Sequence, residues 1–331
     1  MANNSSSASA TAEGVKTLDA AKAKKIASAN NKRGAIGNIL GLSILLGVSY
    51  PLDLMPYAAL SLFLQFTVFF LHGLPYRSEK FYDISGSATH FALVFTSVTA
   101  DESQVRTRRQ MFLAMCSVVW MTRLGTFLYL RVLRDGKDER FDPVKPHALR
   151  FAAFWTVQAV WVFLIQLPVL LLNNMDDTTA EQPIGTTSDY YGLVEIILII
   201  TWFVGFTIEY IADTAKMDFR NKPENRHKYL TDGIWSVCRH PNYFGEILMW
   251  TCMAGVTTVA AIEHRKWYLL SAWLSPAFTA FLLFKVTGIP LVGKAGMKRW
   301  GDDPVYRHYI DNTSLIVPWR PAPAFDATKI E

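Results

Sequence analysis

The sequence predicts an all-α membrane protein, a bundle of about seven to eight transmembrane helices. Three observations lead to this fold class. Apolar runs of about 20 residues, long enough to cross roughly 30 Å of hydrocarbon, recur along the chain. Hydrophobic residues make up 51% and charged residues 18% of the 331 residues, against roughly 25% charged in an ordinary soluble domain. Lys and Arg also gather in alternate loops. Together these features exclude a disordered or fibrous protein and argue against a soluble enzyme.

The first segment, 1–33, is predicted to be a disordered basic tail. It is rich in Ser, Ala, Asn and Lys and has too few large apolar side chains to bury a core. It also lacks the apolar stretch of a cleaved secretory signal. We therefore divide the chain into this tail, a transmembrane domain over 34–320 and a C-terminal tail over 321–331.

The transmembrane domain contains the apolar runs that we interpret as spans. They lie at 34–50, 55–74, 84–100, 110–133, 149–173, 190–212, 243–262 and 267–289. The first and the third are short, so tilted, interfacial or paired helices are the alternatives there.

The distribution of basic residues predicts the orientation in the membrane. Loops 134–148 and 213–242 are rich in Lys and Arg, whereas 174–189 carries acids and neither Lys nor Arg. The positive-inside rule then places both termini in the cytosol, although arginines at 101–109 depart from it. We expect both basic loops and the tail at 290–320 to share the cytosolic side. The net charge of +5 reflects this asymmetry, and no nucleic-acid partner is expected.

Charged side chains within apolar runs are functional candidates, because a charge in hydrocarbon is costly. Glu209 and Asp213 lie four residues apart, on one face of the predicted helix. Their alternative role is to cap the interface. Arg123 lies deep in its run and needs a polar partner, whereas Arg131 can snorkel to the surface.

No metal site is predicted. His72 and His90 stand alone in apolar runs, and neither HxxxH nor HExxH occurs. The three cysteines are widely spaced, so neither a disulfide framework nor a CxxC metal motif is present.

The densest group of polar and aromatic residues precedes the run at 243–262. Pro241 favours an extended His240 and suits the first turn of the helix that follows. The start of that helix offers unpaired N–H groups to an anion, and Arg239 offers a bidentate fork to a phosphate. Trp235 and Tyr243 could stack on a flat ring. A phosphate-bearing aromatic cofactor would fit this corner; a helix cap with interfacial aromatics is the alternative.

These residues resemble the signature of the steroid 5-alpha-reductase C-terminal superfamily, and within it the membrane family DUF1295. The similarity extends over most of 75–320. Its blocks are 82–87, 123–125 with Arg131, 136–141, 209–220, 235–246, 287–290 and 306–318.

The resemblance implies a helical bundle that holds NADPH in a cavity open to the cytosol and reduces a carbon–carbon double bond of a sterol-like or other lipid substrate. By this resemblance the cofactor-binding residues would be Lys216, Arg220, Trp235, Arg239, His240, Asn242 and Tyr243. Tyr243 and Glu246 would be catalytic, and Arg123, Glu209 and Asp213 would support the site. Membrane lipids and an apolar small molecule are the expected partners, in the endoplasmic reticulum or, alternatively, a mitochondrial membrane.

Three departures from the family pattern leave alternatives open. Ala215 stands where the family usually has Gln, and Gly293 where it often has Glu. The N-terminal region also has no counterpart of the catalytic Gln-Glu pair of the steroid reductases, which puts a steroid substrate in doubt. Membrane methyltransferases that use S-adenosylmethionine share the Arg-His-Pro-x-Tyr motif, but 293–298 lacks the paired acids that accompany it. A non-catalytic accessory subunit of a membrane complex is the other alternative.

Overall fold

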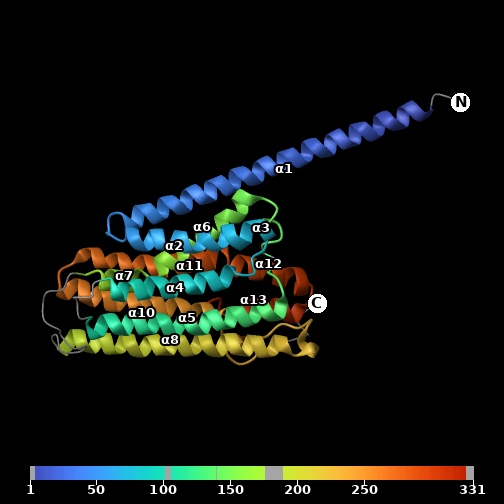
Figure 1. Ribbon diagram of the computed structural model, residues 1–331. Helices are drawn as coiled ribbons and strands as arrows, with labels where there is room; N and C mark the ends of the chain where they lie inside the picture. The colour runs from blue at the N-terminus through green and yellow to red at the C-terminus, as the bar shows by residue number, and fades with distance from the viewer. Residues whose placement is uncertain (1–3, 101–105, 139, 176–188, 326–331) are drawn as a thin grey trace. The chain divides into compact units, whose positions relative to one another are not determined.

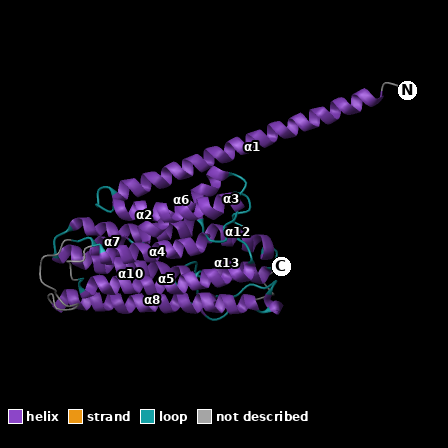
Figure 2. Cartoon of the chain, viewed as in Figure 1, coloured by secondary structure: helices purple, strands orange, loops and turns teal. Residues whose placement is uncertain are grey.

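The structure is a computed structural model that describes residues 4–100, 106–138, 140–175 and 189–325. Helices connected by short loops make up almost all of this part of the chain, which contains no strand (Figure 2). The predicted all-α fold is therefore confirmed.

Within the described residues, six helical stretches are long and apolar enough to cross a membrane. They are Met55–Tyr76, Arg108–Arg134, Ala148–Ile165, Gly192–Asn221, Pro241–Glu263 and Trp267–Trp300. The chain is accordingly an integral membrane protein. The count of seven to eight spans is not confirmed. The run at 84–100 does form a helix, but it includes the buried polar residues Ser85, Thr89 and Ser97, which lower its hydropathy.

The chain forms two compact units, which we call unit 1 and unit 2. Unit 1 consists of Met1–Phe95 and Met121–Phe163, and unit 2 of Thr96–Trp120 and Leu164–Glu331. The long helix α5 (Arg108–Asp135) contributes its first part to unit 2 and its second part to unit 1.

Unit 1 begins with α1 (Asn4–Ser49). From Asn4 onward the segment 1–33 belongs to this helix, and its many Ala and Lys residues favour a helix even without a core to bury. The end of this segment is also held in place. Asn30 is buried, lies 2.8 Å from the His147 ring nitrogen Nε2, and accepts a hydrogen bond from Arg150.

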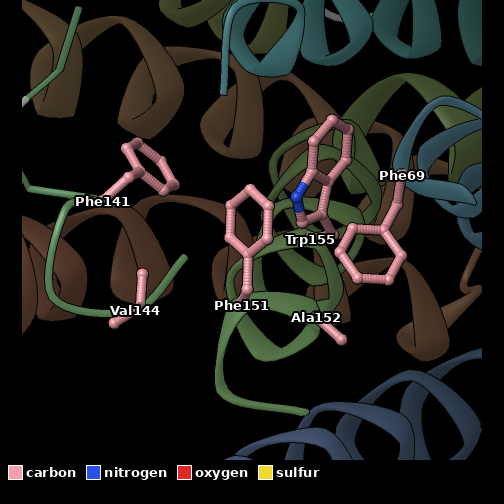
Figure 3. Packing of buried hydrophobic residues seen from close by; sticks show 6 residues of the cluster. All are labelled: Phe69, Phe141, Val144, Phe151, Ala152 and Trp155. Atoms are coloured by element: carbon pink, nitrogen blue, oxygen red, sulfur yellow. The ribbon is translucent and has the colours of Figure 1, made fainter. Parts of the chain in front are cut away.

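Unit 1 also contains the second part of α5, and its other helices pack around an aromatic core. They are α2 (Met55–Val68), the π-helical turn η1 (Phe69–Gly73), α3 (Leu74–Tyr76), most of α4 (Tyr82–Thr99) and α6 (Ala148–Ile165). Figure 3 shows the rings of Phe69, Phe151 and Trp155 packed together, with centroids 5.6–6.3 Å apart. Buried polar groups pair inside this unit, as where Gln65 donates to Thr89.

Unit 2 is built on two long helices, α8 (Asp189–Asn221) and α10 (Pro241–Glu263), which run alongside each other (Figure 1). Two glycines allow their backbones to approach closely. A Cβ at Gly245 would lie 2.5 Å from the carbonyl oxygen of Gly205, so only glycine fits at this crossing. The remaining elements are α7 (Leu167–Asn173), η2 (Pro223–Asn225), α9 (Ile234–Val237), η3 (Trp267–Trp273), α11 (Leu274–Phe281), η4 (Leu282–Val286), α12 (Ile289–Trp300) and α13 (Pro304–Asn312).

The segment after α13 returns along the loop that precedes α10. The backbone N–H of Arg239 donates to the carbonyl of Ser314 at 2.8 Å, and the N–H of Trp319 donates to that of Val237 at 3.3 Å. The hydroxyl of Tyr309 also donates to the carbonyl of Trp235 at 2.8 Å. Residues about 75 positions apart in sequence therefore support the start of α10 together.

Candidate functional site

The candidate site lies in unit 2, where α8 ends and α10 begins. The turn ahead of it uses Gly233, whose φ of 60° is in the region that favours glycine. As predicted, α10 begins at Pro241, but His240 before it is not extended: its φ of −140° and ψ of 61° are neither helical nor extended. Asn242, in the first turn, donates to the buried carboxylate of Asp213 at 3.1 Å. This hydrogen bond connects the last turns of α8 to the start of α10.

Lys216 and Trp235 form the second connection between these elements. The ammonium of Lys216 lies over the indole of Trp235, 4.8 Å from the ring centroid, which is cation–π geometry. Trp235 is buried, and its indole N–H donates to the carbonyl of Ala212 at 3.2 Å. In this arrangement the ring supports and orients Lys216, and its predicted stacking on a cofactor stays a prediction.

His240 and Tyr243 form a stacked pair at the start of α10. Their rings are parallel to within 1°, with centroids 5.0 Å apart. Burial, together with the positive charges of Lys216 and Arg239, lowers the pKa of His240 to about 3. The imidazole is therefore neutral at physiological pH, and the positive charge here belongs to the lysine and the arginine.

Several buried polar atoms near this corner lack hydrogen-bond partners among the described residues. They are Nε of Arg239, Oδ1 of Asn242 and Oγ1 of Thr313. An unsatisfied buried polar group costs about 1–3 kcal/mol, which a polar ligand can recover. A donor, an amide oxygen and a hydroxyl suit a ligand that carries both phosphate and ribose groups.

The other predicted residues are not all placed in this corner. Arg220 is exposed in the last turn of α8, and Glu246 is half-buried one turn after Tyr243 on α10. Glu209 is buried and accepts a hydrogen bond from the indole of Trp120 at 3.1 Å. Arg123 belongs to unit 1, whereas all the other predicted site residues belong to unit 2.

Two sets of residues near the site were not predicted to take part. The first is Thr313 and Ser314 with Tyr309, whose only sequence signal is that they fall in a block matching the family. The second lines a cavity of about 480 Å³ in the same unit, formed by Arg226, His227, Arg299 and Trp300. The Trp300 indole N–H donates to the carbonyl of His227 at 2.8 Å, which fixes one wall of the cavity.

Tyr306 connects this cavity to the candidate site. Its ring packs against Trp300, with centroids 5.6 Å apart, and burial raises the pKa of its hydroxyl while the charge of Arg239 lowers it. One buried tyrosine therefore contacts a wall of the cavity and also feels the charge of Arg239 in the site. In the part of the chain that the structure describes, no group of three or more His, Cys, Asp or Glu could hold a metal ion.

The fold and the site define a class, an all-α integral membrane protein with a cationic site where two of its helices meet. The chain belongs to the family described as a protein of unknown function, DUF1295, whose match covers residues 69–313 and thus most of the chain. This match confirms the resemblance to DUF1295, and it contains every predicted site residue. No curated protein and no solved structure matches the chain.

Proposed function

We propose that the protein is an NADPH-dependent reductase of the membrane, which saturates a carbon–carbon double bond of a sterol-like or other lipid substrate. The observation that carries the proposal is the corner formed by Lys216, Arg239 and the stacked pair of His240 and Tyr243. It combines cations, aromatic rings and unsatisfied buried polar atoms at the start of a long helix.

The cationic side chains would bind the phosphates of the cofactor. Lys216 presents a point charge held over Trp235, and Arg239 presents a planar fork with its Nε free to donate. A neutral His240 adds no further charge, so the field of these two cations draws an anion to this corner. Arg220, exposed in the last turn of α8, and the cavity of Arg226 and Arg299 would bind the more distant phosphate.

The residues of α10 would position the reacting groups. When bound, NADPH supplies a hydride to one carbon of the double bond, and the neighbouring carbon then needs a proton. Tyr243 and Glu246 lie three residues apart, on one side of α10, so either the phenol or a protonated carboxyl could donate that proton. Asp213 fixes the amide of Asn242, which leaves the amide oxygen available to the cofactor.

The test is a binding titration of the detergent-purified full chain with NADPH, NADH and S-adenosylmethionine, followed by the fluorescence of the nicotinamide or by calorimetry. We expect binding of NADPH, weaker binding of NADH and none of S-adenosylmethionine. The Arg239→Ala variant should lose affinity, while Arg265→Ala, an exposed arginine beyond the other end of α10, should not.

Two other binding patterns would identify the alternative functions. Binding of S-adenosylmethionine without NADPH would make the protein a methyltransferase. Binding of neither, with comigration in a large complex on a native gel, would make it an accessory subunit.

A further inference from the structure

A second charged cluster lies at the other end of α10, and the proposed cofactor site does not use it. Arg109 of α5, Glu195 of α8 and Glu263, the last residue of α10, meet within unit 2. Nε of Arg109 lies 2.5 Å from Oε1 of Glu195, and its Nη2 lies 2.8 Å from Oε2 of Glu263. The 23 residues of α10 place this cluster about 33 Å from Pro241.

Glu195 is buried and Arg109 and Glu263 are half-buried, and the formal charges of the three do not balance. The side chains of Arg109, Glu195 and Glu263 are only 14%, 2% and 7% exposed. One guanidinium faces two carboxylates, so the ionised cluster would carry one net negative charge. A buried charge without compensation is costly, and two carboxylates that share one site do not both ionise readily.

The oxygens that face away from Arg109 also lack partners. Oε2 of Glu195 and Oε1 of Glu263 are buried and accept no hydrogen bond from any described residue. These two atoms are on different helices, yet both belong to carboxyl groups bound to the same guanidinium. A neutral carboxylic acid costs much less to bury without partners than a carboxylate does, so a proton on one of these oxygens lowers the cost of leaving it unpaired.

The other charged groups on these elements do not supply the missing positive charge. Arg106 donates to the carbonyls of Val98 and Asn173, and Arg108 is exposed. His264, Arg265 and Lys266 follow Glu263, but among the described residues both carboxylates form ion pairs only with Arg109.

We propose that this cluster is a proton-binding site, in which one of the carboxyl groups of Glu195 and Glu263 holds a proton while the other remains ionised and paired with Arg109. The site then carries no net charge, as its burial in a membrane protein requires. The folded state binds this proton more tightly than the unfolded chain does. Stability is therefore full at low pH and declines as rising pH removes the proton from the folded protein.

The experiment compares the pH dependence of the melting temperature of the detergent-solubilised wild type with that of Glu195→Gln and Glu263→Gln. Glutamine has the shape of the protonated acid and no proton to lose. We expect the melting temperature of the wild type to fall by about 3 °C or more between about pH 6 and about pH 9. At least one Gln variant should lose most of this slope and melt no lower than the wild type at the higher pH.

Glu79→Gln is the matched control, since Glu79 is a buried glutamate with a lysine of its own at 2.5 Å. Its variant should melt lower at every pH and keep the slope. Infrared spectra of the wild type provide a second readout that needs no stable variant. A protonated carboxyl C=O band should be present at neutral pH and should disappear in one of the two Gln variants.

The proposal is overturned if both Gln variants melt well below the wild type over the whole range, because the fold would then need both charges. It is overturned as well if the carboxyl band is absent, or if sodium or potassium ions set the melting temperature at every pH. NADPH binding does not enter these measurements, so their outcome is independent of the proposed reductase function.

Discussion

The charged residues of the two units are organised in different ways. Among the described residues of unit 1, four cations pair with four acids: Lys145 contacts Glu79 at 2.5 Å and Asp142 at 3.1 Å, Lys137 contacts Asp142 at 2.9 Å, Arg131 contacts Asp83 at 2.9 Å, and Arg140 contacts Asp138 at 2.5 Å. In unit 2 the start of α10 brings Lys216 and Arg239 close to His240 and bonds Asn242 to the carboxylate of Asp213, and at the end of α10 one guanidinium faces two carboxylates.

The pKa values outside the spans follow this difference. Burial raises the pKa of Asp138 in unit 1, but the hydrogen bonds and the charge of Arg140 lower this pKa by more than burial raises it. The net shift is therefore downward. At His240 in unit 2, burial and the neighbouring cations all act in one direction. Ion pairs with equal numbers of cations and acids are explained by their role in holding the structure together. A site in which one sign of charge is in excess points instead to a ligand of the opposite charge.

The largest expected effect is on unit 1, where removing one charge breaks a balanced pair. Glu79→Ala leaves Lys145 without its closest partner and the backbone N–H of Asp138 without its acceptor. We expect a loss of about 3 kcal/mol, typical of a broken buried pair, measured as a fall in melting temperature. The control is Lys137→Ala, since Lys137 and Asp142 are 59% and 43% exposed and their pair is worth about 0–1 kcal/mol. Equal losses of stability in Glu79→Ala and Lys137→Ala would contradict this distinction between a buried and an exposed ion pair.

The next effect concerns the cations at the start of α10 in unit 2. Arg239→Ala should weaken NADPH binding by about 1.5–3 kcal/mol, the worth of a charge-assisted hydrogen bond. The melting temperature of the unliganded variant should not fall, because Nε of Arg239 has no partner to lose among the described residues. Arg239→Lys should restore the affinity only in part, because lysine lacks the planar fork. An affinity unchanged in Arg239→Ala would remove this residue from the site.

A third substitution tests whether the packing of α8 on α10 positions the cations. Gly245→Ala would place a Cβ 2.5 Å from the carbonyl oxygen of Gly205 and 2.9 Å from Cβ of Glu209. Forcing the helices apart should cost about 1–3 kcal/mol of stability and weaken NADPH binding as well. Gly293→Ala is the control, because no atom lies within 4 Å of its added Cβ and alanine favours the helix. If Gly245→Ala bound NADPH normally, close packing would not be needed for the site.

The smallest effect is the response of unit 2 to acid. The pKa of His240 is about 3 in the folded protein and close to its ordinary value of 6.5 in the unfolded chain. The unfolded chain therefore binds the proton more readily, and the contribution of His240 to stability is lost as pH falls from about 6.5 towards 3. The melting temperature of the wild type should decline across the upper part of this range, and His240→Asn should decline less. An identical decline in both proteins would assign the acid sensitivity to other groups.

The sequence alone determined the helical class, most of the membrane spans, the start of α10 at Pro241 and the family. These are local properties: about 20 apolar residues form a helix in lipid wherever they stand, and a proline selects the first turn. The helix α1 is local in the same sense, because a segment without a core to bury can be helical when its residues favour a helix.

Only the tertiary structure decided which charges meet. It placed Lys216 over the ring of Trp235, and it brought Ser314 beside Arg239. It also joined Arg109, Glu195 and Glu263, which lie on three different helices. The physical reason is that the energy of a buried charge depends on its neighbours in space. Those neighbours are set by the close approach of α8 and α10 at Gly205 and Gly245 and by the packing of distant segments, neither of which any local pattern encodes.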